Sequence, residues 1–181
     1  KNDDKTSIVL EQQSGSIQNE QKMDNISGKQ AEIQDVYYVH RYILARTSDY
    51  FSALISSQLE TEEKITSTSK FKLHPEAKKA FPGLLDYIYS PRKGIMNLDR
   101  SNAVALRHLA QYFGVSSLLN SVTMLIMKDI NSEYMQKRYL KQASIFNDDD
   151  IKYAVLTQQA KQEVLKPFVE SSFNHIKCTG V

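Results

Sequence analysis

The stretch HRYILARTSDYF, residues 40–51, carries the most structural information in the chain. Its apolar block over residues 42–45 predicts a short helix. Ser48 then stands as the N-cap of a second helix, because a serine hydroxyl can accept a hydrogen bond from an amide of the first helical turn. Phe51 and Leu54 follow it at helical spacing. The stretch therefore predicts two short helices that meet at the serine.

Two β-strands are expected on the N-terminal side of this helical pair. Residues 8–10 form a short apolar run, and residues 35–39 form a β-branched and aromatic run typical of a strand. The segment between them, residues 11–34, is rich in polar side chains, so it cannot bury enough apolar surface to offset its ordering entropy. We therefore expect a hairpin that carries residues 11–34 as a flexible insertion.

A third strand and further helices are expected after the helical pair. A polar loop over residues 56–69 leads to a short strand near Phe71. Pro75 fits the first position of a helix, where its missing N–H costs nothing. Pro82 lies inside the helical pattern that follows. We expect a new helix to begin near Phe81, because a proline in the first turn loses no hydrogen bond.

The remainder of the chain has helical periodicity. Gly114 ends the first of these helices and Ser116 caps the next, whereas Pro167 interrupts the pattern near the end. We expect helices over residues 99–113, 116–130 and 132–146, and from 147 to about 161. Two strands, a helical pair, a third strand and then helices make an α+β fold with a small sheet.

The apolar positions at helical spacing predict one shared core. Its expected members are Leu44, Phe51, Leu54, Leu85, Ile88, Leu106, Leu109, Phe113, Leu119 and Val122. We also place Tyr87 and Tyr89 in this core.

No catalytic, cofactor or metal site is expected. Only His175 with Cys178 has a metal-like spacing, whereas a zinc site needs three or four ligands. No nucleophile motif is present. The six glycines of the chain do not form a phosphate-binding loop. The acidic runs at residues 60–63 and 148–150 are interpreted as a solvated loop and a helix start. The sequence therefore argues against an enzyme with a small-molecule substrate.

The charge balance gives no reason to expect a nucleic acid or a membrane as partner. The 181 residues include 23 Lys and Arg and 21 Asp and Glu, which gives a net charge of +2. No apolar stretch approaches the ~20 residues needed to cross a bilayer, and no signal-peptide pattern is present. A single cysteine fits a reducing compartment, so we expect an intracellular protein, cytoplasmic or nuclear.

Three blocks of the sequence resemble the signatures of the BTB/POZ domain family. The first is HRYILARTSDYF at residues 40–51, the second is AFPGLLDYIYS at 80–90, and the third lies within 102–119 and includes LAQYFGV. Their order and spacing imply a BTB/POZ domain over residues 1–130. The helix before the aspartate run, together with that run, is similar to the first helices of a BACK-type extension, here a partial one over residues 131–181.

The resemblance implies a protein-interaction module without catalytic activity. Members of the family are commonly homodimers, and many bind a cullin scaffold as substrate adaptors of a cullin-based E3 ubiquitin ligase. The alternative is the dimerisation domain of a transcription regulator whose DNA-binding part lies outside this chain. The resemblance assigns a cullin-type surface to Leu54, Ile55, Ser56, Leu59 and Tyr112, and a dimer surface to Tyr42 and Tyr50.

One position departs from the cullin-binding relatives. In those adaptors the segment after the second helix carries an apolar residue, any residue, and then Glu. This chain has Leu54-Ile55-Ser56 there, and residues 59–61 do not restore the pattern. A hydrogen bond to a charged group adds roughly 1.5–3 kcal/mol, so we expect cullin binding to be about ten- to a hundredfold weaker than in a relative with the glutamate.

Overall fold

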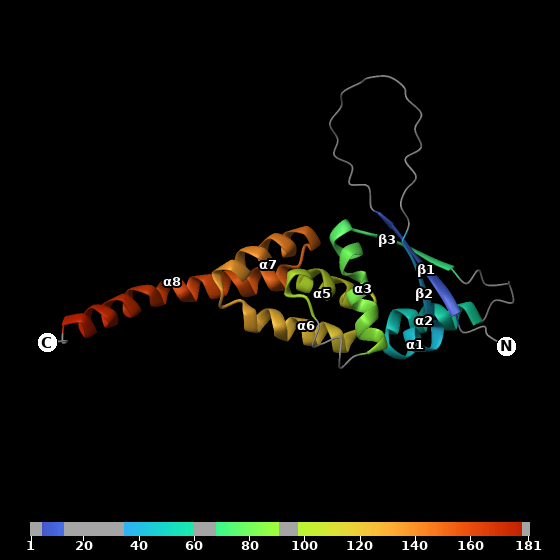
Figure 1. Ribbon diagram of the computed structural model, residues 1–181, viewed down its shortest axis with the longest axis horizontal. Helices are drawn as coiled ribbons and strands as arrows, with labels where there is room; N and C mark the ends of the chain where they lie inside the picture. Colours follow the sequence, from blue (N-terminus) through green and yellow to red (C-terminus); the bar gives the residue numbers. More distant parts are fainter. Residues whose placement is uncertain (1–4, 13–34, 60–67, 91–97, 179–181) are drawn as a thin grey trace, which may run out of the picture.

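The computed structural model describes residues 5–12, 35–59, 68–90 and 98–178. In chain order they form β1 (Lys5–Gln12), β2 (Asp35–His40), α1 (Arg41–Thr47), α2 (Asp49–Leu59), β3 (Thr68–Leu73), α3 (Pro75–Tyr89), η1 (Arg100–Asn102), α5 (Ala103–Tyr112), α6 (Ser116–Asp129), α7 (Glu133–Phe146) and α8 (Asp149–Cys178). The sheet lies at one end of the molecule with α1 and α2, and α8 reaches the opposite end (Figure 1). The predicted α+β class is confirmed.

The sheet is mixed and has the strand order β2-β1-β3. β1 runs antiparallel to β2, with Ile8 opposite Tyr37, and parallel to β3, with Leu10 opposite Phe71. Ile8 and Leu10 lie on the same face because side chains alternate along a strand, and both are buried. β1 includes residues 11 and 12, which the sequence places in the insertion. The rest of that predicted insertion lies outside the described residues.

α1 and α2 form the helical pair predicted around Ser48. The amide of Phe51 donates to Oγ of Ser48 at 3.1 Å, which confirms the predicted cap. The polar loop predicted from residue 56 begins later, because α2 continues to Leu59. Within its last turn the hydroxyl of Ser57 donates to the carbonyl of Leu54 at 2.8 Å, so a polar side chain is accommodated inside the helix.

α3 is one continuous helix over Pro75–Tyr89, so the predicted new start near Phe81 is wrong. Pro75 does stand in the first turn, as predicted. Pro82 is exposed, whereas Phe81 and Leu84 on either side of it are fully buried. Burying this apolar face outweighs the cost of an internal proline, which is about 3 kcal/mol.

The helix predicted over residues 99–113 starts as the 3-10 turn η1. Asp99 caps this turn by accepting a hydrogen bond from the amide of Ser101 at 2.7 Å. α5 then continues to Tyr112, and Gly114 follows with φ 63°. This left-handed conformation suits glycine because it has no Cβ, and the predicted helix end is confirmed.

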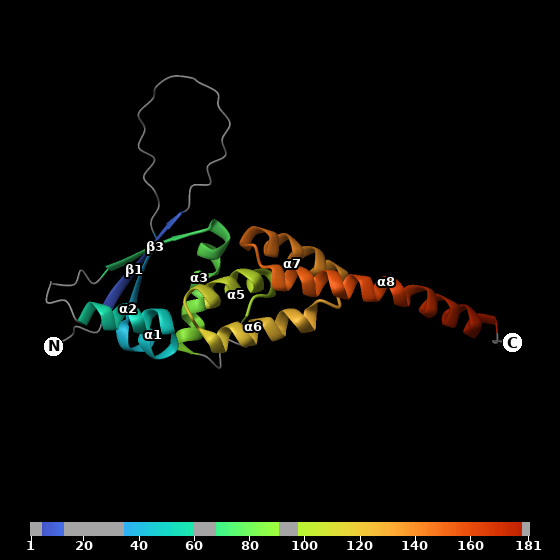
Figure 2. The same cartoon turned by 180° about the vertical axis from the view of Figure 1, so that it is seen from behind.

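α7 and α8 form a helical hairpin beside α5 and α6, and α8 alone extends beyond them (Figure 2). Asn147, with φ 53°, ends α7, and Asp148 accepts a hydrogen bond from the amide of Ile151 at 3.2 Å. The helix start predicted at the aspartate run is therefore confirmed. The interruption predicted at Pro167 is wrong, because α8 continues to Cys178. Pro167 is exposed, and a proline removes only one backbone hydrogen bond from the helix.

The sheet and helices share one hydrophobic core. Seven of the predicted core residues are buried: Leu44, Phe51, Ile88, Leu106, Leu109, Phe113 and Val122. The other three, Leu54, Leu85 and Leu119, are half-buried and pack against the same cluster. Tyr87 is buried as predicted. Tyr89 is instead 39% exposed, because its hydroxyl accepts a hydrogen bond from the amide of His40 at 2.8 Å near the surface.

Candidate functional site

An aromatic cluster joins α2, β3 and the end of α5. The rings of Tyr50 and Tyr112 stack with centroids 6.0 Å apart, and both rings also contact Phe113. Phe51 and Phe71 complete the cluster. The three phenylalanines are buried, whereas Tyr50 is 37% and Tyr112 is 48% exposed. We call these two tyrosines the aromatic face, because they reach the surface from a buried aromatic base.

Hydrogen bonds to two backbone carbonyls hold the start of α2 against the end of α5 beside this face. The amide of Asp49 donates to the carbonyl of Gly114 at 3.2 Å, and the hydroxyl of Ser48 donates to the carbonyl of Phe113. A Cβ on Gly114 would lie 3.2 Å from that of Asp49, which adds crowding to the strain of its positive φ. The two elements that carry the aromatic face are thus fixed relative to each other.

The hydroxyl of Tyr50 remains protonated over a wide pH range. Burial raises the pKa of Tyr50, and the neighbouring Tyr112 raises it further. The neutral hydroxyl is able to donate a hydrogen bond, and the ring offers apolar area.

The residues assigned to a cullin-type surface lie on α2 and at the end of α5. Leu54 and Ile55 are half-buried on α2, and Ser56 beside them is exposed. Leu59 is the last residue of α2, and its side chain lies outside the described part of the structure. Tyr112 is the last residue of α5 and belongs to the aromatic face.

The two tyrosines assigned to a dimer surface differ in their surroundings. Tyr42 on α1 is 68% exposed. Tyr50 is less exposed because it contacts the rings of Phe71 and Phe113 as well as Tyr112. The structure therefore brings Tyr50 together with Tyr112, which the sequence assigned to a different surface.

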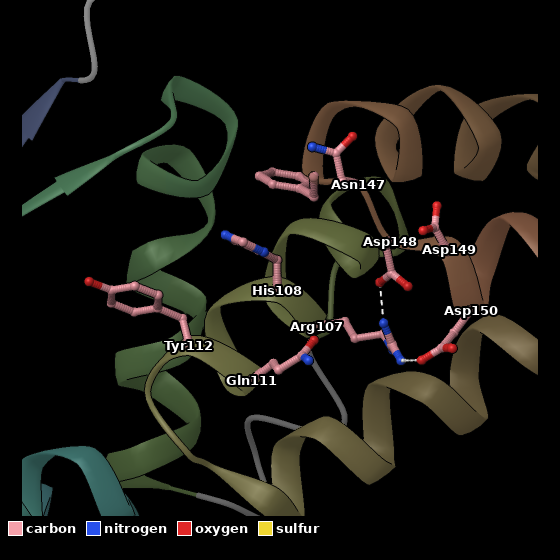
Figure 3. Close-up of a pocket in the computed structure, with 9 residues that line it drawn as sticks. Arg107, His108, Gln111, Tyr112, Asn147, Asp148, Asp149 and Asp150 are labelled. Atoms are coloured by element: carbon pink, nitrogen blue, oxygen red, sulfur yellow. Dashed lines mark hydrogen bonds and ion pairs between the residues drawn. The ribbon is translucent and has the colours of Figure 1, made fainter.

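A groove of about 370 Å³ lies next to Tyr112, between α5 and the turn from α7 to α8 (Figure 3). Arg107 points across this groove towards the aspartates, whereas the ring of His108 points away from them. The walls are formed by Arg107, His108, Gln111 and Tyr112 on α5 and by residues 146–150 on the other side.

Arg107 is the charged centre of the groove and is only 8% exposed. Its Nη1 pairs with Asp148, its Nη2 lies 3.0 Å from Asp150, and its Nε donates to Oγ1 of Thr123 at 3.2 Å. Sequence reasoning assigned the aspartates only to a helix start and missed this arginine. The signal was an arginine inside the otherwise largely apolar run 103–110, since a buried guanidinium requires carboxylate partners.

His108 and His74 both contact the ring of Phe146 at the end of α7. His108 stacks on it with centroids 4.6 Å apart, and His74 meets it edge-on at 5.7 Å. Burial lowers the pKa of His108, Asp148 opposes this shift, and His74 adds to the lowering. His108 is therefore neutral at pH 7 and serves as an aromatic packing surface.

The aromatic face differs in composition from a metal site and from a membrane-spanning helix. Within the described stretches, no group of three or more His, Cys, Asp or Glu residues is arranged to hold a metal ion. No described helix is both long and apolar enough to cross a membrane. What the aromatic face offers is apolar area with hydroxyl groups at its edge, a combination enriched in protein interfaces.

The comparison with protein families agrees with the fold. The family model of the BTB/POZ domain matches residues 29–130, which is more than half of the 181 residues. The matched part contains β2, β3, the helical pair and both elements of the aromatic face. β1 precedes it, and α7 and α8 follow it. The chain therefore belongs to the BTB/POZ domain family, whose members are protein-interaction modules.

Proposed function

We propose that this domain pairs with a second copy of itself and acts as a substrate adaptor for a cullin-based E3 ubiquitin ligase. In this proposal the cullin scaffold docks on the end of α2 and on Tyr112, the dimer forms through Tyr42 and Tyr50, and residues 131–181 form a BACK-like helical extension. The domain contributes binding and orientation, whereas the enzymes of the ligase perform the chemistry.

The observation that carries this proposal is the aromatic face. Tyrosine gives an interface a large apolar area and a polar hydroxyl, and it is enriched among the residues that dominate binding energy. Tyr112 already stacks on Tyr50 and contacts the buried ring of Phe113. Its side chain is therefore ordered before a partner arrives, which lowers the entropy cost of association.

The exposed position of Ser56 makes the missing glutamate testable. Leu54 and Ile55 supply apolar contact on the same helix, and a carboxylate at position 56 would reach solvent and an approaching partner. Each charge-assisted hydrogen bond adds roughly 1.5–3 kcal/mol to binding. Restoring the glutamate is therefore expected to strengthen cullin binding without disturbing the core.

Titration calorimetry with a cullin N-terminal domain tests the proposal. Ser56→Glu should tighten binding about ten- to a hundredfold relative to the unmodified chain. Ser57→Glu is the matched control, because it adds the same charge at the next exposed position, and it should change the affinity far less. If neither the unmodified chain nor Ser56→Glu binds, the adaptor role is wrong. A plain dimerisation module, such as that of a transcription regulator, would then be the better account.

A further inference from the structure

We propose that Arg107 acts as a latch that fixes the direction of the α7–α8 hairpin relative to the BTB/POZ body. The latch consists of Arg107 on α5 with Asp148 and Asp150 at the start of α8 (Figure 3). It crosses the boundary of the family match, because Arg107 lies inside residues 29–130 and both aspartates lie beyond them. The latch thus joins the matched domain to the helices that follow it.

All three nitrogen atoms of the guanidinium group have partners. Nη1 pairs with Asp148, Nη2 with Asp150, and Nε with the hydroxyl of Thr123 on α6. The side chains of Arg107 and Asp148 are only 10% and 7% exposed, whereas that of Asp150 is 84% exposed. The Arg107–Asp148 pair is therefore largely removed from water, and the Asp150 contact closes it at the surface.

Asp148 couples this ion pair to the path of the chain. Its Oδ1 accepts a hydrogen bond from the amide of Ile151 at 3.2 Å, and its Oδ2 binds Arg107. Its own amide donates to the carbonyl of Ala143 at 2.9 Å, one turn before the end of α7. Only Asn147 and Asp148 separate the two helices. One carboxylate therefore fixes both where α8 starts and how it meets α5.

Apolar packing alone would leave this direction less well defined. Tyr139 and Ala143 on α7, and Ile151 and Val155 on α8, are buried in the common core. The hydrophobic effect that drives such packing is non-directional, and the crossing angles of packed helices vary by roughly 15–20° around their preferred values. A planar guanidinium that binds two carboxylates has a fixed geometry. The packing thus holds the hairpin on the body, and the latch is a directional contact at its turn that constrains its angle.

The angle matters because α8 is long. Its 30 residues extend about 45 Å at 1.5 Å per residue, so a small tilt at its start moves its far end by many ångströms. Tyr153 and Leu156, in the first half of α8, are 75% and 55% exposed. With the latch closed, this surface keeps one orientation relative to the aromatic face.

Hydrogen–deuterium exchange on the full chain tests the latch. Asp148→Asn removes the negative charge, but asparagine is as good an N-cap as aspartate, so the helix start is retained. Exchange in the last turn of α7 and the first two turns of α8 should rise at least about tenfold, because Arg107 loses its buried counter-charge. Exchange in α3 should not change. Asp149→Asn is the matched control, since this exposed neighbour pairs with Lys152 and takes no part in the latch.

A second variant protects the test against loss of the whole fold. Asp150→Asn changes a surface residue, and it should raise exchange in the same segment by less than Asp148→Asn does. Unchanged exchange in both variants would overturn the latch. A rise of equal size in α3 and α8 would also overturn it, because the charge pair would then serve the whole fold. Neither result depends on cullin binding, so the latch can fail while the proposed docking function stands.

Discussion

The contacts that stabilise the BTB/POZ body differ in kind from those that position the α7–α8 hairpin. In the body, the rings of Phe51 and Phe113 stack at 5.1 Å, and Phe71 meets Phe113 edge-on at 5.3 Å. In the hairpin, the buried side-chain amide of Gln136 donates to the backbone carbonyl of Ile130, the residue after α6, at 2.6 Å. It also donates to the side-chain oxygen of Gln162 on α8 at 2.9 Å. Interlocking aromatic rings stabilise the body, whereas directional polar bonds place the hairpin.

Further polar contacts connect the hairpin to the helices of the body. The hydroxyl of Tyr139 donates to Asp129 at 3.3 Å, and Asp129 also pairs with Arg100 at 3.2 Å. Burial and the adjacent Asp129 raise the pKa of Tyr139, so its hydroxyl stays protonated as this hydrogen bond requires. Gln142 donates to the backbone carbonyl of Ser101 in η1. Apolar area and polar geometry therefore have separate roles here, and each can be removed by substitution.

The largest effect is expected in the core of the body. Leu109→Ala should lower the free energy of unfolding by about 2–5 kcal/mol, because Leu109 is fully buried and its removal leaves a cavity. Leu156→Ala makes the same chemical change on α8, where the residue is 55% exposed, and should cost less than about 0.5 kcal/mol. Urea unfolding of both variants measures the difference. Equal losses in the free energy of unfolding for the two variants would contradict the difference between the two regions.

A smaller effect is expected where the hairpin depends on polar bonds. Gln136→Ala should cost about 1–3 kcal/mol, because it removes the donor to the buried carbonyl of Ile130 and to the side-chain oxygen of Gln162. Gln111→Ala removes an exposed amide and serves as the control. Thermal unfolding of both variants gives the comparison. If Gln136→Ala is as stable as the control, the polar bonds do not place the hairpin.

Self-association is expected to depend on the body and not on the hairpin. Tyr42→Ala should weaken the dimer roughly fivefold or more, since truncating a tyrosine at an interface often costs over 1 kcal/mol. Tyr134→Ala removes a side chain of similar exposure from α7 and should leave the dimer unchanged. Sedimentation velocity over a concentration series measures both. A chain that is only a monomer at tens of micromolar would rule out the proposed dimer.

The smallest effect concerns the contact between His108 and Phe146. The folded protein binds a proton on the imidazole of His108 more weakly than the unfolded chain does, because burial lowers the pKa of His108 below its ordinary value of 6.5. Neutral His108 therefore makes its full contribution to the free energy of unfolding above about pH 6.5. This contribution is lost as the pH falls through 6.5 towards the pKa of the folded protein. Melting temperatures of the unmodified chain should fall more steeply with acid than those of His108→Gln. Parallel curves would contradict this assignment.

In both regions the sequence predicted best the features that depend on local geometry. Apolar residues at helical spacing and capping residues such as Ser48 and Gly114 act through local geometry, which a sequence displays directly. The predicted breaks near Phe81 and at Pro167 were wrong because a local rule about proline was applied without knowing what the flanking residues bury or expose.

Contacts between distant residues explain what sequence analysis missed at the site. Arg107 and Asp148 are 41 positions apart, and no periodic pattern links them. Tyr50 and Tyr112 were each recognised as interface candidates, but only the folding of α2 against α5 places them in one stack. Periodicity identifies buried faces, whereas pairing across elements requires the three-dimensional structure.

The most direct test of the docking role is the contribution of Tyr112 to cullin binding. The account predicts that Tyr112→Ala binds a cullin N-terminal domain at least about tenfold more weakly by calorimetry, because it removes a pre-ordered aromatic anchor. Tyr153→Ala, on the exposed surface of α8, should bind as tightly as the unmodified chain. Circular dichroism and the melting temperature must show that both variants are folded. Undiminished binding by a folded Tyr112→Ala would contradict the account.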